Sequence, residues 1–107
     1  MAKVSNILAL PQSLPQQELF EVLLKRDRVF IERIISTGQS TPPVEWLDQE
    51  TAEWVILLQG QAELAFETGV AVSLSVGDYL FIPPHQKHRV AATSVNPPCI
   101  WLAIHLS

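Results

Sequence analysis

Short runs of alternating apolar and polar residues, each closed by glycine, proline or a polar turn, fill the sequence from residue 28 onward. Apolar side chains at every second position place one face of a β-strand against a core, so each run predicts a strand. The predicted strands are residues 28–36, 46–48, 53–59, 62–66, 70–76, 79–82, 88–93 and 99–106. All eight prolines fall outside them, as strand pairing requires. Many short strands separated by turns predict an all-β sandwich or barrel.

The first 27 residues follow a different pattern. Ser13 can cap a helix, Pro15 suits its first turn, and Gln16 stands at the capping-box position. The apolar residues that follow at helical spacing are Leu19, Phe20, Leu23 and Leu24. We therefore expect an N-terminal segment with a short amphipathic helix, residues 1–27, ahead of a single β-barrel, residues 28–107.

The composition limits the classes of partner. The chain of 107 residues fits one domain, and 48% apolar residues against 17% charged ones exclude a disordered chain. A net charge of −4, with seven Lys+Arg and no basic run, argues against a nucleic-acid partner. Because no apolar run approaches the ~20 residues that cross a bilayer, we expect no membrane partner either.

Two further expectations concern location and assembly. Cys99 is the single cysteine and cannot form an intrachain disulfide, which fits a reducing compartment, and we expect a cytoplasmic protein. The low charge content predicts an apolar face covered by a partner, most simply a second copy in a homodimer. Trp54 should lie on that outer face, because strand alternation points it away from Glu53.

Two groups of residues have a spacing that points to chemistry. Glu53 is followed after six intervening residues by Gly60, and Gly77 is followed after five by Pro83, with His88 in the next predicted strand. The glycines permit tight turns and the proline ends strand pairing. Because side chains of a barrel strand alternate in and out, Glu53 and His88 can both point into one cavity and offer it an oxygen and a nitrogen donor.

This set of spacings, together with Gly38, resembles the two motifs of the cupin superfamily over residues 38–92. The first motif reads G-x5-H-x-H-x3/4-E-x6-G and the second G-x5-P-x-G-x2-H-x3-N. The resemblance implies a small cupin-type antiparallel β-barrel, a double-stranded β-helix of six to eight strands, with a cavity between its sheets. It also implies a divalent metal ion, held in that cavity by three histidines and one glutamate.

The sequence departs from the cupin pattern at the positions that would hold the metal. With a four-residue gap before the glutamate, the H-x-H pair falls at Trp46 and Asp48. The indole ring would fill a coordination position, whereas the carboxylate could still supply an oxygen. In the second motif His85 replaces the glycine and Ala92 replaces the asparagine. The ligand positions that keep their residue type are Glu53 and His88.

Each candidate also has a purely structural interpretation. Glu53 and His88 can form a buried hydrogen-bonded pair without metal, and Asp48 can be a solvated acid in a turn. His85 fits the rim of the cavity, where it could act as an acid or base or bind the metal. His105 lies in the last predicted strand, and its parity decides whether it can replace a missing ligand or instead faces solvent or a subunit contact.

Three functions fit these observations. The first is binding of a small molecule in the barrel cavity beside a degenerate metal site, with Glu53 and His88 orienting the ligand and Trp46 forming an apolar wall. The second is a metal-dependent oxygenase or isomerase, in which Asp48, Glu53 and His88, helped by His105, hold a divalent ion. The third is a non-catalytic dimeric scaffold whose cavity is a filled core. The fold alone does not choose among them.

Overall fold

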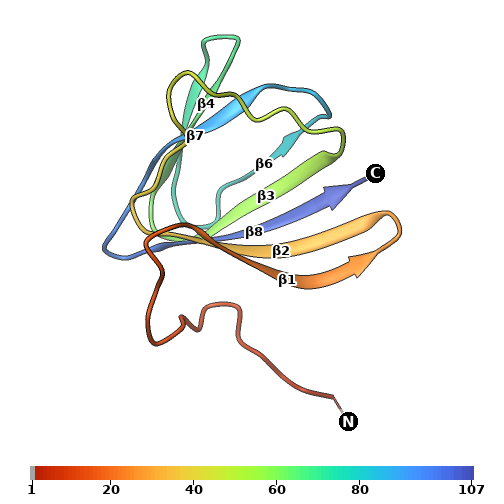
Figure 1. Cartoon of the computed structure of the whole chain (residues 1–107), viewed down its shortest axis with the longest axis vertical. Helices are drawn as coiled ribbons and strands as arrows, with labels where there is room; N and C mark the ends of the chain where they lie inside the picture. The colour runs from red at the N-terminus through yellow and green to blue at the C-terminus, as the bar shows by residue number, and fades with distance from the viewer. Residues whose placement is uncertain (1) are drawn as a thin grey trace.

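A computed structural model describes residues 2–107, which form eight antiparallel strands in two facing sheets (Figure 1). The strands are β1 (Leu19–Arg26), β2 (Val29–Ser36), β3 (Ala52–Gln59), β4 (Ala62–Phe66), β5 (Ala71–Leu74), β6 (Tyr79–Ile82), β7 (His88–Thr93) and β8 (Cys99–Leu106). The larger sheet has the order β1-β2-β8-β3-β6, and the smaller sheet has the order β5-β4-β7. The predicted all-β fold with antiparallel pairing is confirmed.

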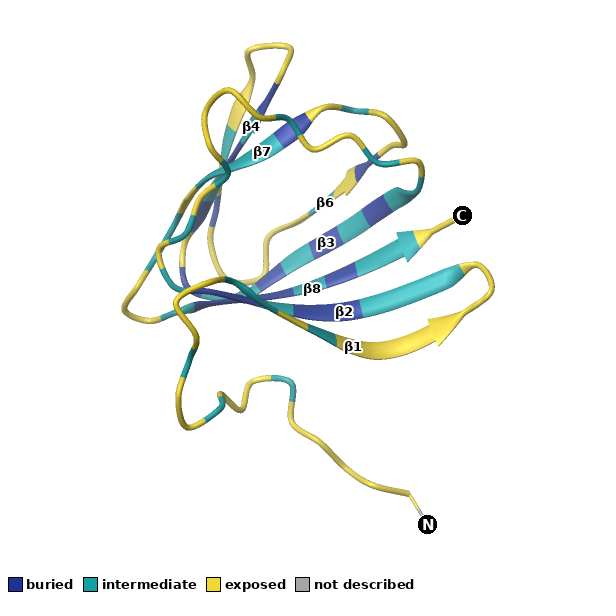
Figure 2. Cartoon of the chain, viewed as in Figure 1, coloured by how far each residue is buried: buried dark blue, intermediate teal, exposed yellow. Residues whose placement is uncertain are grey.

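The core lies between the two sheets (Figure 2). The strands that form it bury alternate side chains, as in β3, where Glu53, Val55 and Leu57 face inward. The buried apolar residues that meet in the middle are Val55, Leu57, Ala62, Leu64, Phe66, Leu74, Ile82, Cys99, Trp101 and Ala103. Full burial of one large apolar side chain contributes about 1.5–3 kcal/mol. This shared interior therefore holds the sheets face to face.

The predicted N-terminal helix is wrong, because Leu19–Arg26 is strand β1, paired antiparallel with β2. The β1–β2 register shifts between Val22 and Leu24, so that Leu23 is the extra residue of a β-bulge. The bulge breaks the period of two, and the apolar residues of the strand then imitate a helical repeat. Residues 2–107 contain no helix of the length and apolarity that a bilayer crossing requires.

Arg33 anchors the segment before β1 to the outer face of the larger sheet. Its Nη2 lies 2.6 Å from a carboxylate oxygen of Glu21, and its Nη1 donates to the backbone oxygens of Ile7 and Ala9 at 2.9 and 2.6 Å. The Arg33 side chain is only 11% exposed. Because a buried charge is costly unless it is paired and hydrogen-bonded, these partners explain both the position of the guanidinium and the path of the N-terminal segment.

The segment between β2 and β3 closes one side of the barrel against β7. The Thr41 N–H donates to the Val90 backbone oxygen at 2.8 Å, and Leu47 and His88 exchange backbone hydrogen bonds of 2.7 and 3.1 Å. The strand predicted at 46–48 is therefore reduced to a single bridge at Leu47. That bridge decides which side chains of the segment turn inward.

Among the four glycines, Gly60, in the turn between β3 and β4, leaves the least room for a side chain. Its φ is +90°, and a Cβ added to it would lie 2.7 Å from Ser94 Oγ and 3.0 Å from Cys99 Cα. We expect Gly60→Ala to lower the free energy of unfolding by about 3 kcal/mol or more, because left-handed strain of about 1–2 kcal/mol adds to the steric overlap. Urea denaturation measures the loss.

Gly69→Ala is the matched control. Gly69 has φ +96°, but an added Cβ would meet nothing within 4 Å. Its substitution should therefore cost only the backbone strain, about 1–2 kcal/mol. Equal losses for the two variants would contradict the close approach of Gly60 to the start of β8.

Candidate functional site

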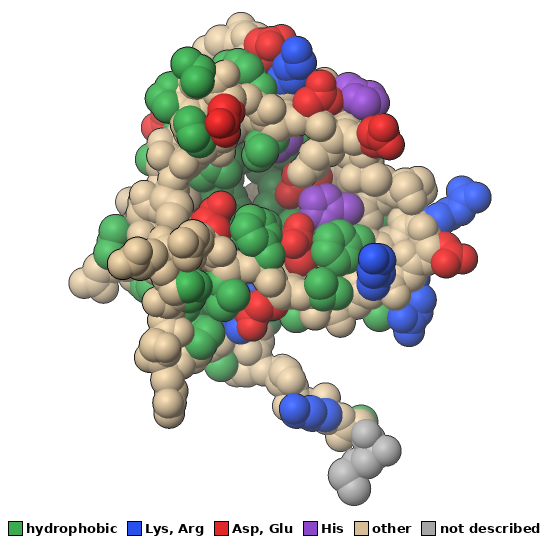
Figure 3. All heavy atoms as spheres, in the orientation of Figure 1, with side chains coloured by type: hydrophobic (Ala, Val, Ile, Leu, Met, Phe, Trp, Pro, Cys, Tyr) green, Lys and Arg blue, Asp and Glu red, His purple; other side chains and the backbone are tan. Residues whose placement is uncertain are grey.

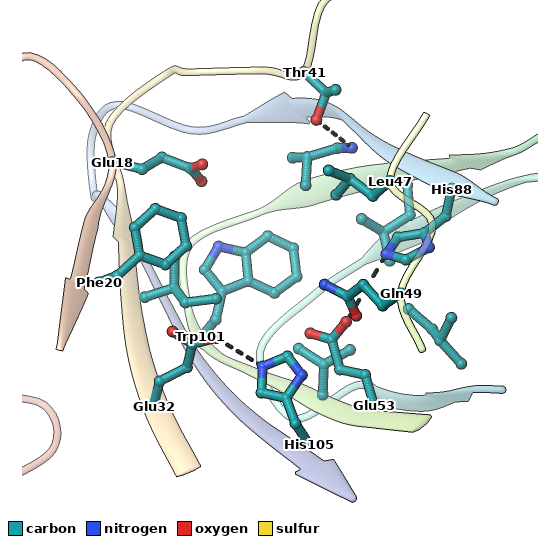
Figure 4. A pocket seen from close by; sticks show the side chains of 15 residues that line it. Glu18, Phe20, Glu32, Thr41, Leu47, Gln49, Glu53, His88, Trp101 and His105 are labelled. Atoms are coloured by element: carbon teal, nitrogen blue, oxygen red, sulfur yellow. Dashed lines mark hydrogen bonds and ion pairs between the residues drawn. The ribbon is translucent and has the colours of Figure 1, made fainter. Parts of the chain in front are cut away.

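A cavity of about 210 Å³ lies between the two sheets and is visible as a hollow in the molecular surface (Figure 3). Both sheets and the 41–49 segment contribute to its wall (Figure 4). The apolar lining residues are Phe20, Ile34, Leu47, Val55, Leu64, Ile82, Val90 and Trp101. The polar ones are Glu18, Glu32, Thr41, Gln49, Glu53, His88 and His105. Three carboxyl groups and two imidazoles thus share one small space.

Glu53 on β3 and His88 on β7 point toward each other from the two sheets (Figure 4). Their side chains are 11% and 5% exposed, and His88 Nε2 lies 3.9 Å from Glu53 Oε1. His88 Nδ1 lies 2.9 Å from the backbone oxygen of Gln86, which can only accept a hydrogen bond, so Nδ1 carries a proton. In neutral His88 the Nε2 lone pair therefore faces Glu53 and the cavity.

His105 also turns inward, which settles its parity. The register of β3 and β8 sets it opposite Glu53, and its Nε2 lies 2.7 Å from Glu32 Oε2. The ring of Phe30 on β2 stacks on it, with centroids 5.4 Å apart. Sequence reasoning missed Glu32 as a site residue. The available signal was a carboxylate between Phe30 and Ile34 on an otherwise apolar face of the predicted strand.

Burial between the sheets raises the pKa of Glu53 above its ordinary value, because a carboxylate there loses its hydration. Charge on His105 and His88 acts in the opposite direction, and the nearby Glu32 carboxylate adds to the rise. Burial outweighs the histidines, so Glu53 keeps its proton to a higher pH than a surface glutamate. A carboxyl group of this kind can donate a proton as well as accept one.

Trp46 and Asp48 do not line the cavity, contrary to the inward placement predicted for them. The bridge at Leu47 turns Leu47 and Gln49 inward instead (Figure 4). The Trp46 ring lies outside, with its centroid 5.8 Å from the guanidinium carbon of Arg89. The H-x-H positions of the cupin pattern therefore fall at Leu47 and Gln49, with a three-residue gap before the motif glutamate rather than four.

His85 lies on the rim, at the place of the cupin glycine. Its φ is +63°, in the left-handed region that favours glycine. Its Nδ1 lies 2.8 Å from Asp48 Oδ1, and the two side chains are 65% and 40% exposed. Its backbone N–H donates to the Gln49 carbonyl oxygen at 2.8 Å. The His85–Asp48 pair thus holds the loop at the rim in place, and neither side chain lines the cavity that contains Glu53.

Trp101 forms a flat wall of the cavity and is held by a short polar chain. Its indole N–H donates to Ser36 Oγ at 3.2 Å, and Ser36 donates to Glu18 Oε2 at 2.5 Å. Because Ser36 is fully buried, its two hydrogen bonds fix the orientation of the Trp101 ring and of the Glu18 carboxylate. Glu18 was also missed from the sequence, because it lies in the segment assigned to a helix.

The family follows from comparison with known proteins. The family profile described as "Cupin domain" matches residues 32–105. The chain belongs to the cupin superfamily. A crystal structure from Ralstonia eutropha, of a protein named a "putative mannose-6-phosphate isomerase", is 38% identical and has a TM-score of 0.92, over 99% of this chain and 99% of that one. A cupin superfamily protein from Desulfitobacterium hafniense is 26% identical, with a TM-score of 0.74, over 90% of this cupin and 83% of that protein.

Among curated proteins, none matches the chain. The family match and the solved structures confirm the resemblance inferred from the two motifs, including its fold. The left-handed His85 stands at the glycine position of the second motif pattern.

The residues at the cupin ligand positions do not fit the family's four-ligand metal ion. Leu47 has no donor atom and Gln49 offers only a neutral amide, which leaves Glu53 and His88. No group of three or more His, Cys, Asp or Glu side chains in the range 2–107 is placed to hold one ion. His105, the predicted substitute ligand, is instead bonded to a carboxylate. These side chains therefore offer hydrogen-bonding and proton-transfer groups rather than a set of metal ligands.

The raised pKa of Glu53 makes stability depend on pH. The folded state binds the proton more tightly than the unfolded state, so stability is complete below the unfolded pKa of about 4.3 and falls as pH rises through the folded value. Glutamine imitates the protonated side chain. We expect Glu53→Gln to melt above the wild type near pH 8 and to lose this advantage only near pH 4, below the unfolded pKa. Thermal melts across that range measure the difference.

Glu63→Gln makes the same chemical change on the half-buried face of β4 and controls for the loss of one carboxylate. If Glu53→Gln is less stable than the wild type near pH 8, the Glu53 carboxylate is stabilised by its neighbours and the direction assigned to its pKa is wrong.

Proposed function

We propose that this cupin barrel binds a small polyhydroxylated molecule, of monosaccharide size, in the cavity between its sheets. The observation that carries the proposal is the lining, in which three carboxyl groups and two imidazoles face an otherwise largely apolar space of about 210 Å³. Sites for drug-sized ligands measure ~300–1,000 Å³. The smaller volume here favours a correspondingly small ligand.

A sugar-like molecule combines hydroxyl groups at its edge with C–H groups on its faces. The carboxylates of Glu18 and Glu32 can accept hydrogen bonds from hydroxyls, and bonds to an ionised acceptor are the stronger ones. Trp101 offers a flat apolar surface to a C–H face. Trp46, which was predicted to fill a coordination position or form a wall of the cavity, lies outside it, so the space between the carboxyl groups and the imidazoles stays open to a ligand.

The name of the Ralstonia neighbour, a "putative mannose-6-phosphate isomerase", favours a monosaccharide as the ligand class. No lysine or arginine among the described residues lines the cavity, whereas three glutamates do. An acidic cavity repels a phosphate group. We therefore place the sugar, and not a phosphate, inside it.

An acid–base isomerase is the second candidate, favoured by the Glu32–His105 pair and the raised pKa of Glu53. Conversion of an aldose to a ketose moves one proton from C2 to C1 and one from the 2-hydroxyl to the oxygen on C1. In this assignment His105 is the base for the C2 proton, Glu32 orients its ring, and the Glu53 carboxyl group protonates the oxygen on C1. The same group takes a proton back from the 2-hydroxyl as His105 delivers its proton to C1.

We also propose a homodimer, in which a second copy covers the outer face of the larger sheet. Trp54 faces away from the cavity and lies 5.4 Å from the Tyr79 ring, and the residues Tyr79 and Phe81 are 64% and 56% exposed. Contiguous exposed apolar side chains mark interaction surfaces.

We also propose a cytoplasmic location for the protein. The free and buried Cys99 agrees with a reducing compartment of this kind.

Titration calorimetry with mannose tests the cavity proposal on the wild type and two variants. Glu32→Gln removes one charge at nearly constant volume and should weaken binding about tenfold, which corresponds to the loss of one charge-assisted hydrogen bond. Val90→Phe fills part of the cavity and should abolish binding while leaving the polar groups in place.

Glu45→Gln, in the exposed part of the 41–49 segment, is the control and should bind as the wild type does. A folded wild type that binds no mannose would reject the cavity proposal and favour the scaffold.

Incubation with mannose 6-phosphate in D₂O tests the isomerase. Hydrogen–deuterium exchange at C2, followed by NMR, should occur with the wild type and be lost with His105→Gln. Sugar binding without exchange at C2 would support the binding function and reject the isomerase.

Phe81→Asp tests the homodimer. The substitution places a charge on the outer face of β6 and should halve the mass in solution, because a desolvated, unpaired carboxylate opposes association. Light scattering after gel filtration measures the mass. Val70→Asp, at a site 55% exposed in the β4–β5 turn, adds the same charge elsewhere and should leave the dimer intact. A monomeric wild type would contradict this proposal.

A further inference from the structure

The hairpin between β1 and β2 places a basic surface beside the acidic cavity. We propose that this hairpin binds the phosphate group of a phosphorylated sugar whose uncharged part occupies the cavity. The inference rests on the proposed function and adds the substrate class to it. The hairpin is formed by the end of β1, the two-residue turn Asp27–Arg28 and the start of β2.

The charge of the hairpin differs from that of the rest of the chain. Lys25, Arg26 and Arg28 are three of the seven Lys+Arg in a protein whose net charge is −4, and they stand against the single carboxylate of Asp27. All three are exposed, and none has a carboxylate within ion-pair distance among the described residues. The three cations are therefore available to an anion from solution.

The hairpin and the cavity are joined by shared wall residues. An open hollow of about 450 Å³ lies against the hairpin and is lined by Lys25, Arg26 and Arg28 together with Asp27 and Ser107. It borders the cavity, because Glu32, Gln49 and His105 line both spaces. Figure 3 shows the same arrangement, with Lys and Arg side chains at the right of the view, next to the hollow where Asp, Glu and His side chains are exposed.

This juxtaposition suits a ligand with two unlike ends. A phosphate monoester carries a charge near −1.5 to −2 at neutral pH, and guanidinium and ammonium groups are its usual partners. The glutamates keep that end out of the cavity, and the hairpin receives it at the edge. Arg26 Nη1 already donates to the Lys25 backbone oxygen at 2.9 Å. Lys25 and Arg28 are therefore the residues assigned to the phosphate.

The test compares mannose, mannose 6-phosphate and inorganic phosphate by titration calorimetry at low ionic strength. The wild type should bind mannose 6-phosphate about tenfold more tightly than mannose, since two exposed charge pairs each add a modest amount. The double variant Lys25→Ala/Arg28→Ala should lose this preference and bind mannose as before. Added salt should reduce the preference in the wild type, because exposed charges are screened.

Lys3→Ala/Lys87→Ala is the matched control, since it removes two positive charges away from the hairpin, and it should keep the preference. Equal affinity of the wild type for mannose and mannose 6-phosphate, or an unchanged preference in the hairpin variant, would overturn this inference and leave the cavity proposal standing. Phosphate bound by the wild type and not by the hairpin variant, with no binding of mannose, would instead retain the anion site and reject the cavity proposal. No binding of any of the three would reject both.

Discussion

The site depends on the antiparallel register of β2, β8 and β3. That register sets His105 between Phe30 and Glu53, and it leaves Glu32 on the same face, within hydrogen-bond distance of the His105 ring. A slip of one residue in either pairing would turn a charged side chain to the outer face. The smaller sheet then adds His88 from the opposite side. Carboxyl and imidazole groups are thus held together in a space dry enough to raise the pKa of a glutamate.

Most of the fold could be predicted from the sequence, because burial between two sheets imposes a period of two on each inner strand. The turns were equally readable from glycine and proline. The first strand could not be predicted in this way, since a bulge at Leu23 interrupts the period and an edge strand has little burial to enforce it. The pairing of β1 with β2 is a tertiary contact, which the local sequence pattern does not indicate.

The site follows the same rule: residues on regular strands could be predicted, and residues placed by tertiary contacts could not. Glu53 and His88 were identified because their strands are regular and their spacing matches the cupin motifs. The residues between β2 and β3 were assigned the wrong parity, because a single bridge at Leu47 sets their orientation and a gap of three or four residues fits the motif equally well. Glu32 and Glu18 reach the cavity through the pairing of distant strands, which spacing along the chain does not show.

A crystal structure of the protein grown with mannose 6-phosphate tests the central claim most directly. The predicted result is a sugar ring against Trp101, with hydroxyl groups at hydrogen-bond distance from Glu32 and Glu53 and the phosphate at the β1–β2 hairpin. Density for an ion bound by Glu53, His88 and Gln49, or a cavity that holds only water at saturating sugar phosphate, would contradict it.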